Sequence, residues 1–308
     1  MDTFINNHGA AQINHRVNEA IASAQSLTLG ANQGDKGTVS VDTIYGGLAV
    51  LPDCERNTPG DIYVGNRGSG TLTVTNGGKV WNGHCYIAAV ANPDQASNGA
   101  VTIKGEGSVW ILAGDECSGG AGLFIGSTAT SDVGGTALLD VRDGAMIEVV
   151  NSVDVPDVKV GLSGTLTGNG LLILSGSIPG SDTAVVLGTL APGGTLRIAG
   201  NLRLELSATT VCSVTPQASD NVQVVQQWGN RTDGGWGHAT LDGKLSVTMT
   251  GDFTPGTSFT LVHADAGRSG TFHSYSIKYN PVPGGQCFTP TVTYDANNVY
   301  LYLEPCTQ

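Results

Sequence analysis

The feature that most constrains the fold of this chain is a short segment that recurs along it. Residues 70–81 read GTLTVTNGGKVW, and residues 99–110, twenty-nine positions later, read GAVTIKGEGSVW. A third copy, LDVRDGAMI at 139–147, keeps the Leu-x-Val-x-x-Gly core of the first. Repeats spaced by about twenty to fifty residues predict a solenoid, a propeller or another array, because one unit cannot bury its apolar face without its neighbours.

Within each copy, apolar residues alternate with polar ones and glycines follow, which is typical of a half-buried strand that ends in a tight turn. The chain has 45 glycines in 308 residues and only 6% aromatic residues, a composition that suits thin stacked layers better than a thick core. A propeller blade needs four strands in about forty to fifty residues, more than these spacings provide. We therefore predict an all-β fold, a right-handed parallel β-helix.

The sequence divides into three predicted regions. They are a helical cap at 1–30, regular coils at 31–205, and irregular coils with a second cap at 206–308. The unequal distances between the repeats predict that loops at 91–98 and 127–134 bulge from the coils, and such loops are places where function resides on rigid scaffolds.

The cap is predicted as a helix over residues 10–28. Val17, Ile21, Ala24 and Leu27 fall on one helical face, and Gly30 is placed to end the helix. A helix in this position would cover the open end of the strand stack and prevent end-to-end association. The functional alternative is that it docks onto a partner.

Charge and hydropathy exclude several classes of function. The net charge is −12, and the 14 Lys and Arg residues are scattered singly, so no basic stripe exists for nucleic acid. No apolar run reaches the eighteen residues that a membrane-spanning helix needs. Residues 1–30 also lack the basic start and apolar stretch of a secretory signal. An acidic, weakly charged exterior is ordinary for an extracellular protein, so we expect an extracellular or cell-surface location. A chain that reaches its destination without a secretion signal could instead be assembled into a virion, which is the alternative.

Six cysteines are spread along the chain without any C-x-x-C pair, which argues against zinc ribbons and thioredoxin-like motifs. They are Cys54, Cys85, Cys117, Cys212, Cys287 and Cys306. Disulfides and free thiols buried in the solenoid are both open interpretations. The preferred disulfide joins Cys287 and Cys306, since that bond would tie a proline-rich loop to the last strand.

No pattern of catalytic or metal-binding residues emerges, so we predict a non-enzymatic protein without cofactor or metal. A β-helical polysaccharide lyase or hydrolase would need paired carboxylates or a calcium-binding aspartate cluster. The densest acidic region holds Asp140, Asp143, Asp154 and Asp157. Strand alternation and turn chemistry account for these four aspartates. The pairs His84-Cys85 and His263-x-Asp265 are isolated.

One insertion has a composition that asks for explanation. Residues 226–238 read QQWGNRTDGGWGH, which places Trp228 and Trp236 in a glycine-rich loop. The tryptophans could fold back over the last coils. Alternatively, they form a stacking platform for a sugar ring or a partner surface, with Arg231 and Asp233 as hydrogen-bonding groups.

Residues 188–204, GTLAPGGTLRIAGNLRL, resemble a recurring segment of bacterial autotransporter passenger domains. Stretches between 219 and 272 resemble the terminal coils of that family, and 288–303, FTPTVTYDANNVYLYL, resembles the strand pair that ends many passengers. The resemblance covers roughly 60–303 and implies a secreted or surface-displayed β-helix. The chain departs from the family in carrying six cysteines and in showing neither a secretion signal nor an outer-membrane barrel.

We expect a non-enzymatic, surface-exposed β-helix that acts as an adhesin-like passenger or structural module. Its partners would be glycans or other surface proteins. A structural component of a virion or an extracellular appendage is the alternative, in which the chain forms a homo-oligomer or packs against other subunits of an assembly. A polysaccharide-degrading enzyme is a third hypothesis.

Overall fold

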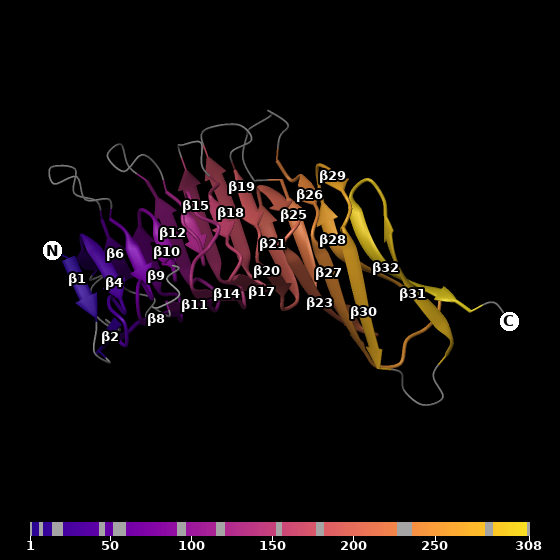
Figure 1. Ribbon diagram of the computed structural model, residues 1–308, viewed down its shortest axis with the longest axis horizontal. Coiled ribbons are helices and arrows are strands. Elements are labelled where there is room, and N and C mark those ends of the chain that lie inside the picture. The colour runs from indigo at the N-terminus through magenta and orange to yellow at the C-terminus, as the bar shows by residue number, and fades with distance from the viewer. Residues whose placement is uncertain are drawn as a thin grey trace.

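Three long β-sheets run side by side along the whole molecule (Figure 1). The structure is a computed structural model. It describes residues 2–5, 9–13, 21–42, 47–51, 60–90, 97–114, 121–151, 156–176, 182–226, 236–280 and 286–306. In these residues every regular element is a strand.

Apart from the short strand β24 and the terminal hairpin β31–β32, each sheet takes every third strand of the chain, so strands far apart in the sequence become neighbours. Sheet A contains, in spatial order, β1 (Asp2–Ile5), β4 (Ser26–Leu29), β7 (Ile62–Val64), β10 (Cys85–Ile87), β13 (Leu123–Ile125), β16 (Val158–Val160), β19 (Thr183–Val186), β22 (Asn201–Leu204), β26 (Ala239–Leu241) and β29 (Arg268–Gly270). Sheet B contains β2 (Gly9–Ile13), β5 (Lys36–Asp42), β8 (Ser69–Thr75), β11 (Asn98–Lys104), β14 (Thr136–Arg142), β17 (Gly164–Gly168), β20 (Thr189–Pro192), β23 (Thr209–Thr215), β27 (Lys244–Thr250) and β30 (Ser274–Asn280), with β24 (Ala218–Ser219) beside β23. Sheet C contains β3 (Ile21–Ala24), β6 (Gly47–Val50), β9 (Lys79–Asn82), β12 (Val109–Ala113), β15 (Met146–Asn151), β18 (Leu171–Gly176), β21 (Thr195–Ala199), β25 (Asn221–Val225), β28 (Ser258–Ala264), β32 (Asn298–Pro305) and β31 (Phe288–Tyr294).

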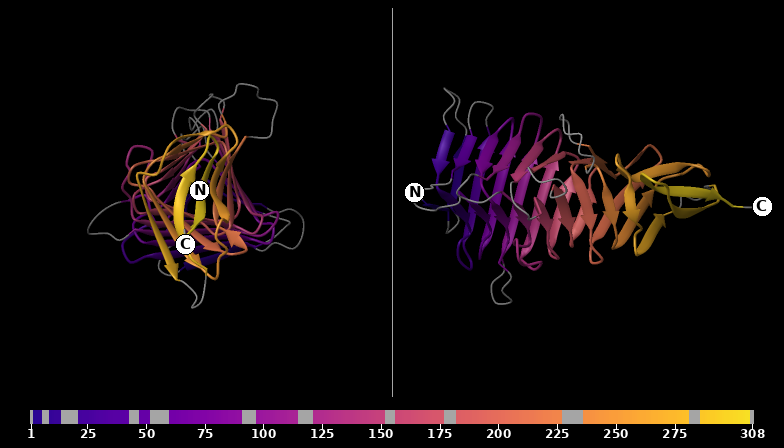
Figure 2. Two further views of the ribbon diagram at one scale, coloured as in Figure 1. Left: turned by 90° about the vertical axis from the view of Figure 1, so that its right-hand side faces the viewer. Right: turned by 90° about the horizontal axis from the view of Figure 1, so that it is seen from above.

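One strand from each sheet makes one coil of a solenoid, and the coils stack through parallel strand pairing. Viewed along the long axis, the sheets enclose a three-sided section (Figure 2). Alternate residues point inward from each sheet and form one continuous aliphatic core, in which Leu72, Val101 and Leu139 are fully buried. The prediction of an all-β solenoid is confirmed.

Equivalent positions of the sequence repeat pair with one another in sheet B. Gly99 pairs with Gly70 and Val101 with Leu72, and Val101 also pairs with Leu139 of the third copy. Identical positions of successive coils therefore lie directly above one another, which explains why the same residue types recur.

The two tryptophans that end the first two copies do not stack. The turn from β11 to β12 is one residue longer than the turn from β8 to β9, so Trp110 pairs with Val80 and Trp81 pairs with Ile111. A slip of one residue exchanges the two faces of a strand. Trp110 is consequently fully buried and donates a hydrogen bond from Nε1 to Asn82 Oδ1, whereas Trp81 lies on the outer surface of sheet C.

The predicted cap helix at 10–28 is wrong. The described residues of this segment lie in β2, β3 and the beginning of β4. Leu27 and Leu29 face the core from β4, and β4 pairs in parallel with β7 of the next coil, so strand pairing uses the apolar residues that suggested a helical face. Ile21 is 54% exposed on β3, and Val17 lies outside the described residues.

The C-terminal end departs from the parallel pattern. Strand β32 pairs antiparallel with β28, and β31 pairs antiparallel with β32, so a hairpin ends sheet C (Figure 1). Phe253 packs edge-on against Phe259, Tyr279 and Phe288, with ring centroids 5.8–6.2 Å apart, and closes this end of the core.

Nothing in the described part of the chain forms a helix long and apolar enough to span a bilayer.

Candidate functional site

The tryptophan insertion, residues 226–238, lies between β25 and β26 in the chain. Of the four side chains predicted to bind a ligand there, Trp228, Arg231 and Asp233 lie outside the described residues. Trp236 is described and is partly exposed, three residues before β26 begins. The structure therefore fixes where the insertion is rooted.

Hydrogen bonds hold both ends of this insertion. The Gln226 N–H donates to Asp265 Oδ2 at 3.0 Å, and the His238 N–H donates to Asn201 Oδ1 at 3.1 Å. The Gly237 N–H donates to the carbonyl oxygen of Gly200 at 3.0 Å. These partners belong to the neighbouring coils, so the insertion starts and ends at fixed points on the frame.

A polar network lies beside the root of the insertion, between β28 and the hairpin turn. His263 Nε2 lies 3.0 Å from Asp265 Oδ1, and His263 Nδ1 lies 2.7 Å from Asn298 Oδ1. The Asn298 Nδ2 group donates to both carboxylate oxygens of Asp295 at 3.0 Å, and the Tyr300 hydroxyl donates to Asp295 Oδ2 at 2.9 Å. This network joins the antiparallel hairpin to the last parallel coils.

Hydrogen bonds to the Asp295 carboxylate stabilise its charged form. The donors are the backbone N–H of Asn297, then the side chain of Asn298, with the Tyr300 hydroxyl contributing less, and together they lower the pKa of Asp295 to about 2. The same hydrogen bond raises the pKa of Tyr300, because ionised tyrosine could not donate it. The neighbouring Arg268 guanidinium lies 4.7 Å above the ring of Tyr294 and fastens the same turn.

A ladder of aromatic rings stands on the outward-facing side of sheet A, where Tyr63 and Tyr86 are partly exposed and Phe124 is fully buried. Tyr63, Tyr86 and Phe124 stand on successive strands with ring centroids 5.0 and 5.1 Å apart and nearly parallel planes. The Tyr63 hydroxyl donates to Asp61 at 3.1 Å, and His84 Nδ1 lies 3.5 Å from the same carboxylate. Burial, followed by the Asp61 charge, raises the pKa of Tyr86 to about 12. Because the rings stack on one another, most of their faces are occupied within the protein.

Of the acidic residues singled out in the sequence, Asp140 and Asp143 are close enough to interact, and each contacts a basic side chain. Asp140 forms a 2.9 Å ion pair with Arg142 on the outer face of sheet B, and Asp143 lies 3.7 Å from Lys104 at the adjoining turn. Asp157 is fully buried at the corner before β16. Asp154 lies outside the described residues.

The two histidine pairs also differ. His84 lies outside the coil and stacks with Tyr86, whereas Cys85 points into the core and is fully buried, so the two side chains face opposite sides of the sheet. His263 and Asp265 contact each other. In the part of the chain that the structure describes, no three His, Cys, Asp or Glu side chains gather as a metal site requires.

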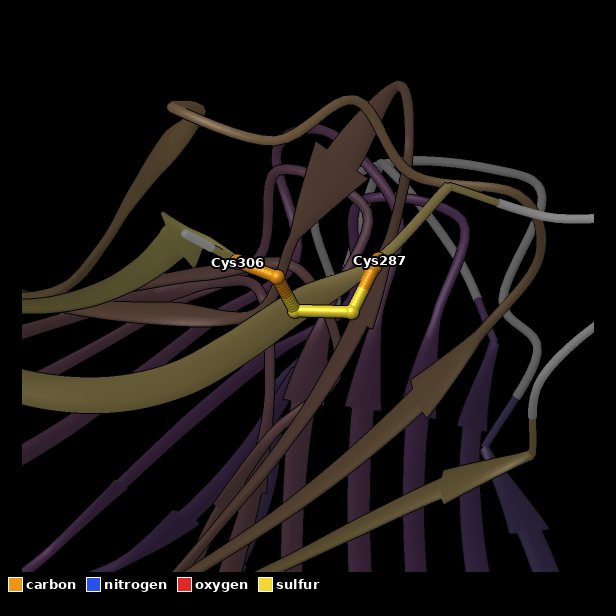
Figure 3. Close-up of a disulfide and its surroundings, with 2 residues drawn as sticks. All are labelled: Cys287 and Cys306. Atoms are coloured by element: carbon orange, nitrogen blue, oxygen red, sulfur yellow. A yellow bond between two sulfur atoms is a disulfide. The ribbon is translucent and has the colours of Figure 1, made fainter. Parts of the chain in front are cut away.

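A disulfide joins Cys287 to Cys306 across the ends of β31 and β32 (Figure 3). This is the pair that the sequence favoured, and it joins the open ends of the two hairpin strands; Pro281 and Pro283 lie outside the described residues. Cys85 and Cys212 are free and buried, while Cys54 and Cys117 lie outside the described residues.

The outer faces of sheets B and C differ in character. Sheet B presents rows of hydroxyl side chains. They include Thr38, Ser40, Thr71, Thr73, Thr102, Thr165, Thr167, Ser246 and Thr248. Sheet C instead presents apolar side chains over neighbouring strands. They include Trp81, Val109, Ile111, Ala113, Met146, Val150, Leu171 and Ile173.

The sheet C surface is hollowed near its N-terminal end. A depression of about 280 Å³ is lined almost entirely by apolar atoms. Its lining residues are Ile21, Ala49, Leu51, Trp81, Asn82, Ile111 and Ala113. Ile21 and Leu51 are 54% and 52% exposed at its rim. Contiguous apolar surface of this kind marks an interaction site more often than an isolated exposed leucine does.

Sequence reasoning missed both the sheet C surface and the His263 network. The alternation of residues in β9 and β12 could have revealed the sheet C surface, because Trp81 and Ile111 both occupy outward positions. Aligning the two sequence repeats instead matches Trp81 with Trp110, since the two turns differ in length by one residue. His263 is 35 residues from Asn298, and only the antiparallel return of β32 brings them together.

Comparison of the chain with models of known protein families finds no match, and comparison with curated proteins finds no match either. The resemblance to autotransporter passenger domains therefore rests on the segments quoted above.

Proposed function

We propose that this chain is a non-enzymatic, surface-exposed β-helix that acts as an adhesin-like module and binds glycans or other surface proteins through its tryptophan insertion. The observation that carries the proposal is the anchoring of both ends of the insertion, through Gln226 to Asp265 and through His238 to Asn201. Binding residues are concentrated on loops that a rigid scaffold positions. A stack of parallel coils is such a scaffold.

The residues of the insertion suit a sugar ligand. The rings of Trp228 and Trp236 offer apolar faces for the C–H surface of a sugar ring. Arg231 supplies hydrogen-bond donors and Asp233 supplies acceptors for the sugar hydroxyl groups. A pocket built in this way combines stacking area with a few orienting polar groups.

A glycan array tests this proposal. The wild-type chain should bind a defined subset of glycans, and a Trp228→Ala, Trp236→Ala double variant should lose that binding. Tyr275→Ala is the control, because Tyr275 is an exposed aromatic residue on β30 of sheet B and belongs neither to the insertion nor to sheet C. Equal binding by the double variant and the wild type would exclude the insertion as the sugar site.

The finer description of the fold belongs to the same proposal. The coil is right-handed, because connections between parallel strands of one sheet are right-handed in about 98% of proteins. Display outside the cell follows from the resemblance to passenger domains. An experimental density map would reveal the handedness directly, and a left-handed coil would remove the basis for that resemblance.

A structural component of a virion or an extracellular appendage is the second candidate. The apolar outer face of sheet C, with the depression around Trp81, supports it because subunits in assemblies need such surfaces. Mass spectrometry of purified particles or appendages from the source organism tests this candidate. Recovery of the chain in stoichiometric amounts would support it, and recovery only in the soluble secreted fraction would exclude it.

A further inference from the structure

The three sheets end differently at the C-terminal end of the molecule (Figure 1). Sheet A ends in β29, which has three residues, and sheet C ends in β31, which contains Pro290 and is closed by the disulfide. Sheet B ends in β30, which has seven residues and no proline. Short edge strands and prolines are two ways in which proteins prevent an edge from pairing with another chain. The last edge of sheet B has neither protection.

The backbone of β30 is paired on one edge only. The Ser274 N–H donates to Gly243 O at 3.3 Å, toward β27, and β27 pairs with β30 along its whole length. Successive residues of a paired strand direct their backbone groups to opposite edges. The N–H and C=O groups of Tyr275, Ile277 and Tyr279 therefore point away from β27, where no strand pairs with them in the described part of the chain. Donors and acceptors in this alternation match those of another extended backbone.

The core-facing side of β30 is also incomplete. Tyr275 and Ile277 pair with Leu245 and Val247 of β27, which are buried in the core, so all four occupy core-facing positions. The Tyr275 side chain is nevertheless 53% exposed, and Ile277 is only partly buried. In a solenoid each coil is covered by the next one, and β30 has no further neighbour among the described strands of sheet B. Apolar surface is therefore uncovered beside the free edge.

Sheet C extends one strand further than sheet B. Strand β32 lies next to β28, and β31 lies beyond β32. Val299 and Leu301 of β32 are fully buried, whereas their pairing partners Tyr294 and Val292 on β31 are only partly buried. The difference arises because β30 faces β32 across the core, while no described strand of sheet B faces β31. One strand added to the edge of β30 would fill that position.

We propose that the free edge of β30 binds an extended segment of a partner protein, which joins sheet B as one further strand. The backbone of this segment would pair with the unpaired N–H and C=O groups of β30. Its apolar residues, at alternate positions, would pack against Tyr275, Val292 and Tyr294. The residues between them would face solvent beside Ser276 and Lys278, where polar or acidic side chains fit. In strand addition, main-chain hydrogen bonds give affinity and alternate side chains give specificity.

The projecting hairpin favours a single strand over a second copy of the chain as the occupant. The hairpin β31–β32 extends beyond β30 from sheet C (Figure 2). Every full coil contributes one strand to each of the three sheets. A second solenoid that continued sheet B would therefore have to place one of its own strands where β31 already lies, whereas a single extended segment needs only the position beside β30.

Fluorescence anisotropy with a labelled peptide tests the proposal on the full chain. The probe has the sequence of residues 69–75, SGTLTVT, with blocked ends, because β8 pairs in parallel on both of its edges within sheet B. It should bind saturably. A control peptide that carries Leu72→Ser and Val74→Ser keeps the backbone but loses the apolar alternation, and it should bind about tenfold more weakly.

Variants of the chain locate the bound peptide. Ile277→Pro removes an N–H from the free edge but none from the ladder with β27, and it should weaken binding about tenfold. Ile277→Ala keeps that N–H and should weaken binding less. Tyr275→Asp places a charge at an exposed position beside the added strand and should weaken binding several-fold. Leu206→Asp is the matched control, since Leu206 is 63% exposed between β22 and β23, and it should bind the peptide as the wild type does.

Three results would overturn the proposal. The first is a wild-type chain that shows no saturable binding of the 69–75 peptide. The second is equal binding by the wild type and by either Tyr275→Asp or an Ile277→Pro variant that circular dichroism shows to be folded. The third comes from light scattering: a wild-type dimer that becomes a monomer in Ile277→Pro would show that a second copy, and not a segment of a partner protein, occupies the edge.

Discussion

Replacing Gly65 with alanine should destabilise the solenoid much more than an ordinary surface substitution. Gly65 follows β7 at the corner that leads to β8, and its φ is 72°. A Cβ atom at this position would lie 1.9 Å from the carbonyl oxygen of Asn98, which belongs to the next coil. The substitution therefore combines backbone strain with a collision between coils.

The expected loss in the free energy of unfolding is the sum of the backbone strain and the cost of the collision. A non-glycine residue in the left-handed region costs about 1–2 kcal/mol. The collision is with backbone of the next coil, so relief requires these two coils to separate near Gly65, where the Ala88 N–H donates to Val64 O at 2.9 Å and the Asn98 N–H donates to Gly68 O at 2.9 Å. Weakening two such hydrogen bonds costs about 1 kcal/mol each. We expect a loss of about 3–4 kcal/mol in the free energy of unfolding.

Two further variants divide this value into its parts. Gly34 has a φ of 81°, and a Cβ atom added there would have nothing within 4 Å, so Gly34→Ala should cost only the strain of about 1–2 kcal/mol. Ala88 occupies the equivalent corner after β10 with a φ of 49° and is fully buried. In Ala88→Gly, relief of about 1–2 kcal/mol of strain is offset by the lost burial of one methyl group, about 0.8 kcal/mol, and by the flexibility of glycine, about 0.5–1 kcal/mol, so the free energy of unfolding should change little.

Urea denaturation followed by circular dichroism measures these differences, with the slope of the transition compared between variants so that a change in cooperativity is not mistaken for a change in stability. If Gly65→Ala and Gly34→Ala lowered the free energy of unfolding equally, the close approach of Gly65 to the next coil would be refuted.

Three other predictions concern the cysteines and the hairpin. Cys306→Ser should lower the stability of the terminal hairpin by about 3 kcal/mol, because the disulfide to Cys287 closes a loop with a sequence separation of 19. Hydrogen exchange of β31 and β32 should become faster, while that of the central coils stays constant. Cys85 and Cys212 should not react with a thiol reagent at pH 8 until the protein is unfolded. Burial raises the pKa of the Cys212 thiol to about 12 and that of the Cys85 thiol well above its ordinary value. Peptide mapping that finds either cysteine labelled in the native protein would contradict this prediction. The pKa of Asp295 is lowered from its ordinary value of 3.8 to about 2, so the ionised carboxylate stabilises the hairpin above pH 3.8 and this contribution is lost as the pH falls toward about 2. Hydrogen exchange of the hairpin should therefore increase as the pH falls through this interval in the wild type. In Asp295→Asn the exchange should show no such change.

The solenoid was predictable from the sequence because the same residues set both the strand alternation and the coil register. Leu72, Val101 and Leu139 recur in the repeat, and they stack in the core for the same reason. Coils that stack on one another have similar residues at equivalent positions, so the repeat that predicts the solenoid can be recognised within one sequence.

The N-terminal helix was predicted wrongly because a short apolar segment fits more than one periodicity. Leu27 and Leu29 alternate as a strand requires, while Leu27 also fits a helical face with Ile21 and Ala24. Stability of a short helix comes mainly from tertiary packing, and here the edge of β7 offered a strand partner instead.

The surface features could not be derived in the same way. The orientation of Trp81 depends on one residue of turn length, which alternation within a strand does not specify. The partners of His263 depend on an antiparallel return that the parallel repeat does not anticipate.

The central claim is that the molecule is one elongated solenoid of stacked coils, and small-angle X-ray scattering of the full chain tests it most directly. The ten strands of sheet A span nine spacings of about 4.8 Å, or about 43 Å, before the terminal hairpin is added. We predict an elongated particle whose length matches the stacked coils with the terminal hairpin added. A compact globular particle would contradict the solenoid.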